Sequence, residues 1–318
     1  MTITKEKGTL RVDVPLTNIT IDYKNFSYPL AMGEAFPILP VKKQSGMYYR
    51  FDKKSFITAN SNWSPGSSGK IVSPYVASTD NYGCGRHKLL GEVTDEDKAQ
   101  ADKALQVEAT TAKKVKDMLL LEKEIAIATA LQDSDDTYSA YTDAVSEAWN
   151  AAASTPRADV NDAKASIRTN AAVDPSELTM IISHDKFLDL QNNDEVRDQF
   201  KYTSKESVSK DMLARYFDVK KVIVVSGVYN SADEGQAASM ADIWTDSKAT
   251  LLYTPDRPAL REPSAGYIVG ENLFGSGSQR VRKFRDSDES KEQDLIEVTD
   301  SWDVLETANE AVFVLTSV

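Results

Sequence analysis

The longest regular pattern of apolar positions runs from residue 95 to residue 131. No glycine or proline interrupts this stretch, and its small and apolar residues recur at steps of 4, 7, 3, 4, 7 and 4. That spacing keeps one stripe of a helix apolar, and Thr94 followed by three acids is a typical helix start. We therefore predict a helix of about 55 Å, at roughly 1.5 Å per residue, that packs on a sheet. The alanine-rich stripe comprises Ala101, Leu105, Ala112, Val115, Leu119, Ala126 and Ala130.

The stretch before this helix has no comparable pattern. Prolines at positions 15, 29, 37 and 40 rule out a long helix in residues 1–43 and favour an extended arm. Residues 47–57 and 70–76 are predicted as two strands of a long excursion over residues 44–86, with turn formers gathered at 60–69. Neither the arm nor an isolated pair of strands buries enough apolar surface to be stable alone. We expect both to lie on another part of the molecule or on another molecule.

Beyond residue 136 the pattern changes to alternating helices and strands, which is typical of an α/β unit. Strands are predicted at 178–183, 221–225 and 249–253, and helices at 156–170, 184–191 and 207–217. The last part of the chain predicts two paired strands, 279–285 and 294–299, around a charged turn, and a final strand at 311–315. The fold class predicted for the whole chain is α+β.

Composition and charge remove several classes of protein. The chain has 318 residues with 37 basic and 49 acidic side chains, a balance of −12 that argues against a surface dedicated to nucleic acid. Its hydrophobic content of 41% is too high for a disordered chain. The single cysteine, Cys84, cannot form an intramolecular disulfide or a cysteine-based zinc or iron–sulfur site. No apolar run reaches the roughly 18 residues of a membrane span, and the start lacks the apolar segment of a secretory signal.

The residue types that carry catalysis are sparse and scattered. His87 and His184 have no ligand or triad companions in the sequence, and we predict structural or surface roles for both. The sequence Gly83-Cys84-Gly85 lacks the context of a nucleophile, and a turn that ends the second strand of the excursion is the better interpretation. No phosphate-binding loop occurs. The sequence therefore predicts no catalytic residue, no cofactor and no metal, and indicates that the protein is not an enzyme.

One predicted strand is strongly basic in this acidic chain. It carries Arg280, Arg282, Lys283 and Arg285. Strand alternation places Arg280 and Arg282 on one face, and Lys283 and Arg285 on the other. The strand is interpreted either as an edge strand protected by its charge or as a subunit contact that meets acids of a neighbour. Acids of the required kind follow directly at Asp286, Asp288 and Glu289. Contact with nucleic acid is a third and weaker alternative.

The order of the predicted parts suggests a family. An arm, a long two-stranded loop, a long helix, an α/β body and a late pair of strands follow one another. The local sequence agrees in PVKKQSGMYYRFDK at 40–53, VYNSADEGQAASMADIW at 228–244, LLYTP at 251–255 and PSAGY at 263–267. In these features the chain resembles, over nearly its whole length, the major capsid proteins of tailed bacteriophages, which have the Hong Kong 97-type fold.

The resemblance implies a division into four regions and a structural function. The implied regions are an N-arm at 1–43, an E-loop at 44–92, a P-domain with a long spine helix and a β-hairpin at 93–134 and 279–303, and an α/β A-domain at 135–278 and 304–318. Copies would close into hexamers and pentamers of an icosahedral head around double-stranded DNA, which they would hold without sequence specificity. The implied further partners are a separate scaffolding protein, a portal and a decoration protein, with no membrane. The implied locations are the virion and, during assembly, the host cytoplasm.

Trp63 and Lys70 are further candidate contact residues in the E-loop. An exposed tryptophan at a turn is best explained by burial against another subunit. Some relatives crosslink neighbours through a loop lysine and an asparagine, and Lys70 with Asn60 or Asn62 has the residue types for this. Some relatives also carry a scaffolding segment of about a hundred residues before the E-loop, which this sequence lacks. We therefore expect either a mature form or a separate scaffold.

Three other functions compete with this interpretation. An encapsulin, a cellular nanocompartment, has the same fold, but its start is typically a helix, whereas here it is punctuated by prolines. An α/β enzyme is suggested by residues 157–253, but no nucleophile, metal or phosphate motif supports it. A DNA-binding module is disfavoured by the charge of −12.

Overall fold

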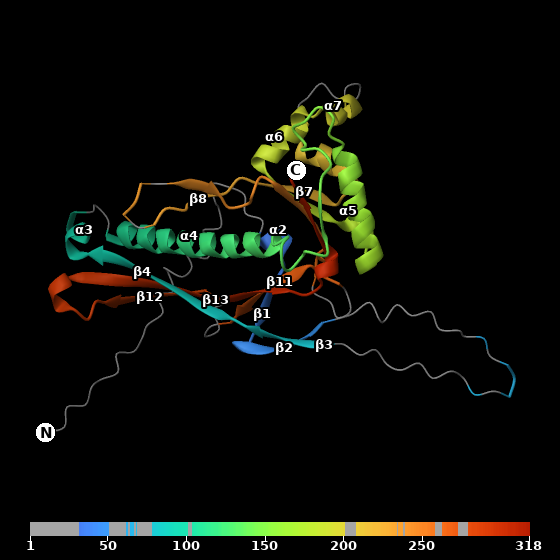
Figure 1. Cartoon of the computed structure of the whole chain (residues 1–318). Coiled ribbons are helices and arrows are strands. Elements are labelled where there is room, and N and C mark those ends of the chain that lie inside the picture. The colour runs from blue at the N-terminus through green and yellow to red at the C-terminus, as the bar shows by residue number, and fades with distance from the viewer. Residues whose placement is uncertain are drawn as a thin grey trace.

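Two five-stranded sheets and one long helix organise the part of the chain that the structure describes (Figure 1). The structure is a computed structural model. It describes residues 32–50, 62, 64–66, 68, 78–100, 104–200, 208–233, 235–237, 239–257, 263–272 and 279–318. Helices and strands are mixed in the way that the α+β prediction requires.

The first sheet is built around β13 (Gln293–Glu306), a strand of 14 residues. Its first part pairs antiparallel with both β12 (Gln279–Arg285) and β4 (Gly85–Thr94), and its end pairs with β11 (Gly266–Glu271). The short strand β1 (Ile38–Val41) adds to β11 in parallel. The predicted pairing of 279–285 with 294–299 is confirmed, whereas β4, β11 and β1 were not predicted.

A long helix lies across one face of the first sheet. The predicted helix appears as α3 (Asp95–Gln100) and α4 (Ala104–Leu131), and Thr94 caps α3 by accepting a hydrogen bond from Asp97 N at 3.1 Å. The middle of the predicted stripe is correct, because Ala112, Val115 and Leu119 are buried against the sheet, whereas the side chains of Ala101 and Leu105 lie outside what the structure describes.

The second half of that stripe is wrong. Ala126 and Ala130 are only partly buried, whereas Ile127 and Leu131 are fully buried. The buried line continues from Leu119 by steps of four through position 123, which is a lysine. Because this position on the buried face is a lysine, the predicted stripe of apolar residues avoided it. The prediction therefore followed Ala126 and Ala130, which lie on a neighbouring face of the helix.

Gly91 of β4 lets α4 approach the sheet closely. A Cβ atom at this position would lie 2.5 Å from Thr111 Cγ2 and 2.8 Å from Val115 Cγ2. We expect Gly91→Ala to lower the free energy of unfolding by about 1–3 kcal/mol, because overpacking forces the helix to shift. Urea denaturation would measure the change, with Gly83→Ala as the control because no atom lies within 4 Å of that Cβ. Equal effects of the two substitutions would show that the helix is not held this close.

The second sheet has the strand order β5-β14-β10-β6-β7. Its strands are β5 (Thr142–Ala144), β14 (Val312–Thr316), β10 (Lys248–Leu252), β6 (Thr179–Ser183) and β7 (Lys221–Val225). The predicted strands at 178–183, 221–225, 249–253 and 311–315 are therefore confirmed to within about one residue. Strands β6, β7 and β10 are buried along most or all of their length, as a sheet covered on both faces requires.

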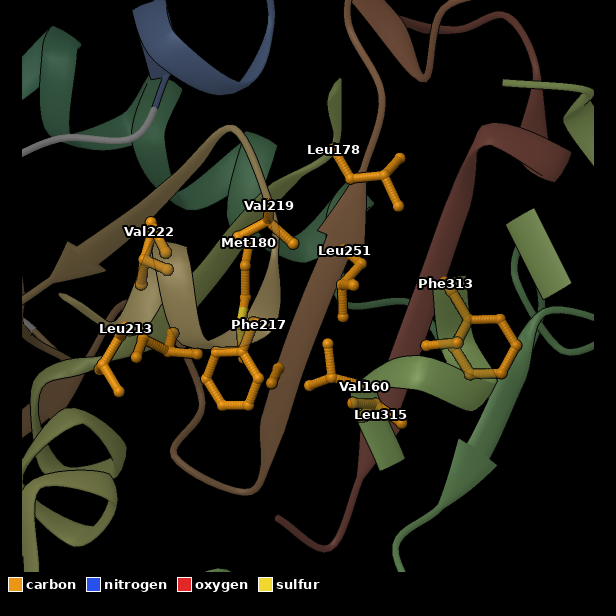
Figure 2. Packing of buried hydrophobic residues seen from close by; sticks show 14 of the residues in the cluster. Val160, Leu178, Met180, Leu213, Phe217, Val219, Val222, Leu251, Phe313 and Leu315 are labelled. Atoms are coloured by element: carbon orange, nitrogen blue, oxygen red, sulfur yellow. The ribbon is translucent and has the colours of Figure 1, made fainter. Parts of the chain in front are cut away.

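Helices cover one face of the second sheet. They are α5 (Pro156–Ala171), α6 (His184–Asn192), α7 (Asp194–Phe200) and α8 (Lys210–Phe217). Figure 2 shows Met180 and Leu251, from paired strands, in one cluster with Leu213 and Phe217 of α8. The opposite face packs on the end of α4 and on the first sheet, through a cluster that includes Ile181, Ile127 and Trp302. This second cluster joins the two sheets into one body.

Local signals explain where these helices begin and end. Ser183 and Ser209 cap α6 and α8 by accepting hydrogen bonds from the backbone N–H groups of Lys186 and Met212. The helix predicted at 207–217 therefore starts at residue 210. At the other end of α8, Lys164 Nζ donates to the carbonyl oxygens of Phe217 and Asp218, at 2.7 and 2.8 Å. Helix α7 was not predicted.

A two-stranded hairpin leaves the first sheet next to Cys84. It consists of β2 (Ser45–Arg50) and β3 (Ser78–Gly83), which pair antiparallel. The predicted first strand, 47–57, is observed at its start, and the predicted second strand, 70–76, lies outside the described residues. Cys84 is the single residue between β3 and β4, and its backbone N–H donates to Gln44 O at 2.8 Å; a strand of the excursion ends here as predicted, but no turn is found at this residue. The cysteine is buried, and burial raises the pKa of its thiol to about 11.

Part of the predicted arm rests on its own chain. Residues 1–31 lie outside the described residues. After α2 (Met32–Ala35), Phe36 is fully buried and β1 pairs with β11. The remaining short elements are β8 (Val228–Asn230) and β9 (Met240–Asp242), which pair, and the 3₁₀ turns η2 (Pro175–Glu177), η4 (Glu289–Lys291) and η5 (Asn309–Ala311).

Candidate functional site

The basic strand β12 divides its charges between the two faces of the first sheet. Lys283 and Arg285 lie on the face covered by α3 and α4. Lys283 Nζ is 2.6 Å from Glu108 Oε1 of α4, and the guanidinium of Arg285 is bound by both carboxylate oxygens of Asp95, at 2.7 and 2.6 Å. These two cations therefore have acidic partners within the chain, on the face that strand alternation predicts.

Arg280 and Arg282 lie on the opposite face, away from the helices. Arg282 is directly across from Glu297 of β13, and its Nε donates to Glu297 Oε1 at 2.6 Å. Arg280 lies 3.9 Å from the same carboxylate, and Lys88 of β4 approaches it from the other side. Glu297 is 1% exposed. Burial alone would raise the pKa of Glu297, but hydrogen bonds from Lys88 and Arg282 hold it below its ordinary value.

A fourth cation extends this cluster. Arg86 of β4 lies 3.6 Å from Glu271 of β11. Burial lowers the pKa of Arg280, and the nearby charges of Arg282 and Arg86 lower it further, which shows how closely the cations are grouped. We call the four cations the cationic patch: they are Arg86, Lys88, Arg280 and Arg282. With Glu271 and Glu297 as the two counter-charges, the patch has a net charge of 4 − 2 = +2.

A buried polar network joins α4 to β13 and β4. Lys123 and Asp300 are 4% and 0% exposed, with 3.5 Å between Nζ and Oδ2. Lys123 Nζ also lies 5.4 Å above the ring of Trp302. The ring of His87 stacks on the ring of Trp302, with centroids 4.5 Å apart, and His87 Nδ1 is 2.9 Å from Glu122 Oε1. His87 thus has a structural position in this network, which holds the helix in register with the sheet.

The sequence did not reveal this network. The signal in the sequence that could have indicated this network is the pair of charged residues at positions 123 and 124. They follow Leu119 by about one helical turn and lie on the buried side of α4. Glu124 is also buried, and it accepts a hydrogen bond from Trp244 Nε1 at 2.9 Å. Such pairs hold elements in register, because a buried charge without its partner is costly.

The other predicted contact residues cannot be placed. Trp63 and Lys70 lie outside the described residues, so their roles stay predictions. Within the described ranges, no group of three or more His, Cys, Asp or Glu side chains is arranged to hold a metal ion. A membrane-crossing helix, long and apolar enough for a bilayer, is likewise not found among the described helices. The distinctive features of the described surface are thus the charges of the first sheet.

Comparison with known proteins gives two kinds of similarity. No family model matches the chain. The major capsid protein of Burkholderia phage BcepMu is 25% identical over 266 residues, which are 81% of this chain and 83% of that protein. A phage-related protein from Bordetella bronchiseptica has a similar structure, with a TM-score of 0.75 and 21% identity over 97% of this chain and 98% of that one. The capsid of cyanophage P-SCSP1u gives a TM-score of 0.58 at 10% identity, over 100% and 93% of the two chains.

The fold is therefore the Hong Kong 97-type fold of phage capsid proteins. An encapsulin from Synechococcus elongatus PCC 7942 shares it, with a TM-score of 0.53 and 12% identity over 100% of this chain and 92% of that one. The sequence similarity, however, is to a phage protein. The sequence similarity to a phage major capsid protein and the capsid fold together indicate a structural, non-enzymatic role in a capsid. The family resemblance seen in the sequence is thereby confirmed, with the encapsulin as the less supported alternative.

Proposed function

We propose that the chain forms the head of a tailed phage, in which its copies close into hexamers and pentamers of an icosahedral shell around double-stranded DNA. The single observation that supports this most is the similarity to a phage major capsid protein over 81% of the chain. The fold supports it independently, because the chain is similar in structure to the capsid protein of a cyanophage along its full length.

The four regions implied by the resemblance are proposed with one adjustment. Helix α4 and the strands β12 and β13 would form the core of the P-domain at 93–134 and 279–303. The second sheet and helices α5 to α8 would form the A-domain at 135–278 and 304–318. Because β11 pairs with β13, its six residues at 266–271 are better assigned to the P-domain than to the A-domain.

The proposed mechanism of assembly is the burial of parts that cannot be stable alone. The β2–β3 hairpin of the E-loop forms a sheet of only two strands, and Met47 on it is 74% exposed. Two strands are marginal in water, so a neighbouring copy would supply the missing contacts. Each contact is modest, but a closed shell multiplies it by the number of copies.

Other partners follow from the same proposal. A separate scaffolding protein and a portal would guide assembly in the host cytoplasm, and a decoration protein would bind the finished virion. Packaged DNA would be enclosed without sequence-specific contacts, since the chain has a net charge of −12. Electrostatic repulsion between the wall and the phosphate backbone would keep the DNA mobile while it enters.

Assembly is the direct test of this function. We expect the purified chain to form large particles or rings that dynamic light scattering detects and electron microscopy resolves. A monodisperse monomer at high concentration, both with and without a co-expressed scaffold, would contradict the proposal. An encapsulin would instead form closed shells that enclose a host protein, and protein identification from purified particles would separate the two functions.

A further inference from the structure

The first sheet carries opposite charges at two separate places. One place is the cationic patch, with its net charge of +2. Arg86 and Lys88 make it accessible, because their side chains are 55% and 48% exposed. Arg280 and Arg282 lie deeper, with side chains that are 15% and 17% exposed. The patch thus has an exposed rim and a fixed, partly buried base.

The other place is the end of the same sheet, where α3 begins and β12 turns into β13 (Figure 1). We call residues 95–98 and 283–294 the acidic tip. It holds eight acids and four bases, so its net charge is 4 − 8 = −4. The tip is one structural unit, because Asp95 N donates to Glu292 O at 3.0 Å and Lys98 binds both Asp95 and Asp294.

The bases of the tip are largely occupied inside it. Lys98, Lys283 and Arg285 each contact Asp294, and Lys98 and Arg285 also contact Asp95. The exposed acids are therefore the charges that the tip presents to another molecule. They include Glu96, Asp97, Asp288 and Glu292.

In the part of the chain that the structure describes, the exposed acids of the tip form no ion pair with the patch of their own chain, whose acidic partners are Glu271 and Glu297. The tip and the patch lie on the same paired strands, and an extended strand advances about 3.3 Å per residue, which puts residue 286 roughly 13 Å beyond Arg282. The hydrogen bonds of β12 with β13 hold this separation fixed. Only a second copy of the chain can place an acidic tip on a cationic patch. Such a contact joins two different surfaces, and it propagates from copy to copy until a ring or shell closes.

We infer that the acidic tip of one copy docks on the cationic patch of the next, so that the first sheets of neighbouring subunits contact each other head to tail. This inference rests on the proposed function. The sequence predicted that all four cations of β12 could contact a neighbouring subunit. The inference restricts this contact to Arg280 and Arg282, together with Arg86 and Lys88 of β4. Lys283 and Arg285 are instead paired with acids of their own chain. Nucleic acid is the less favoured occupant, since the neighbouring tip repels phosphate.

Charge reversal tests the contact from both sides. In the patch variant, Arg86→Glu with Lys88→Glu changes the patch from +2 to −2. In the tip variant, Glu96→Lys, Glu289→Lys and Glu292→Lys change the tip from −4 to +2. We expect each variant to assemble at least about tenfold more slowly in light scattering, because like charges would then face each other. The combined variant restores opposite charges, and we expect it to assemble within about threefold of the wild type.

The matched control reverses two exposed bases of the proposed A-domain, Arg168→Glu with Lys210→Glu, which gives the same change in net charge as the patch variant. Circular dichroism would show whether each variant is folded. If the patch variant does not fold, the tip variant still tests the contact. Glu96 and Glu292 are exposed, so we expect their replacement to leave the fold intact. A tip variant that assembles at the rate of the control overturns the inference, and so does a combined variant that is no faster than the single ones.

The same experiment separates failure of the proposed function from failure of the tip-to-patch contact. If the wild-type chain forms no particles, the proposed function fails. If the wild type assembles and the reversals have no effect, only the tip-to-patch contact fails. A patch variant that assembles normally but encloses less nuclease-protected DNA would assign the patch to nucleic acid, and that result would also overturn the inference.

Discussion

Replacing Lys123 with methionine is expected to lower the free energy of unfolding by about 3–5 kcal/mol, because the fully buried Asp300 carboxylate would lose its cation. Among the described residues, Asp300 Oδ1 has no hydrogen-bond partner, and Oδ2 would keep the hydrogen bond from Gln279 Nε2 at 3.2 Å, a neutral donor that does not replace the cation. Burial lowers the pKa of Lys123, and Asp300 only partly offsets this. Urea denaturation of the purified chain, followed by circular dichroism, would measure the loss.

The double variant Lys123→Met with Asp300→Leu tests whether the loss of stability comes from the unpaired Asp300 charge. Apolar replacement of a whole buried ion pair is often neutral or stabilising, so we expect it to recover most of the lost stability. The matched control is Lys114→Met, an exposed lysine on the same helix, with an expected change within about 0.5 kcal/mol. If Lys123→Met behaves like Lys114→Met, the pair does not hold α4 to the sheet.

Deleting residues 58–72 is expected to abolish or strongly impair assembly while leaving the body of the chain folded. The deletion removes the tip of the proposed E-loop with Trp63 and Lys70, but keeps β2 and β3, which pair from Ser45 with Gly83 to Arg50 with Ser78. The cores of the two sheets consist of residues from other parts of the chain, which the deletion leaves unchanged. Electron microscopy and light scattering would follow assembly, and circular dichroism the fold.

The control for this deletion is the removal of a loop elsewhere in the chain. Shortening the β8–β9 connection within residues 231–239 removes part of a loop that joins two short strands of a separate two-stranded sheet. Normal shells from the E-loop deletion would refute the proposed role of this loop. Loss of the folded body would also contradict our account, because it would show that the loop supports its own chain.

Elements whose signals are local could be predicted from the sequence. Helices α5, α6 and α8 and strands β6, β7 and β10 have compact apolar patterns, and serines at 183 and 209 mark where two of the helices begin. Strand β4 was missed because its alternation is broken at Leu90, which is 52% exposed, and at Gly91, which faces the helix. Its partner lies about two hundred residues away, so no local pattern identifies it.

The charges of β12 show how far prediction of the candidate site can go. Alternation along the strand correctly separates Arg280 and Arg282 from Lys283 and Arg285. The partners are a different matter, because Glu108 and Asp95 are 175 and 190 residues away in sequence from the cations they bind. Only the pairing register and the position of α4 bring them together. The sequence therefore predicted which residues share a face, but not which charges are already neutralised.

The position of β13 near the end of the chain bears on the timing of biosynthesis. Every other strand of the first sheet except β1 hydrogen-bonds to β13, and β14, an inner strand of the second sheet, follows it. Before β13 is synthesised, β4 and α4 can pack on each other, but β4 has no strand of the first sheet to pair with. Pairing over such sequence distances is also slow. The first sheet, with its cationic patch and acidic tip, is therefore complete only once β12 and β13 have been synthesised, about 160 residues after the end of α4.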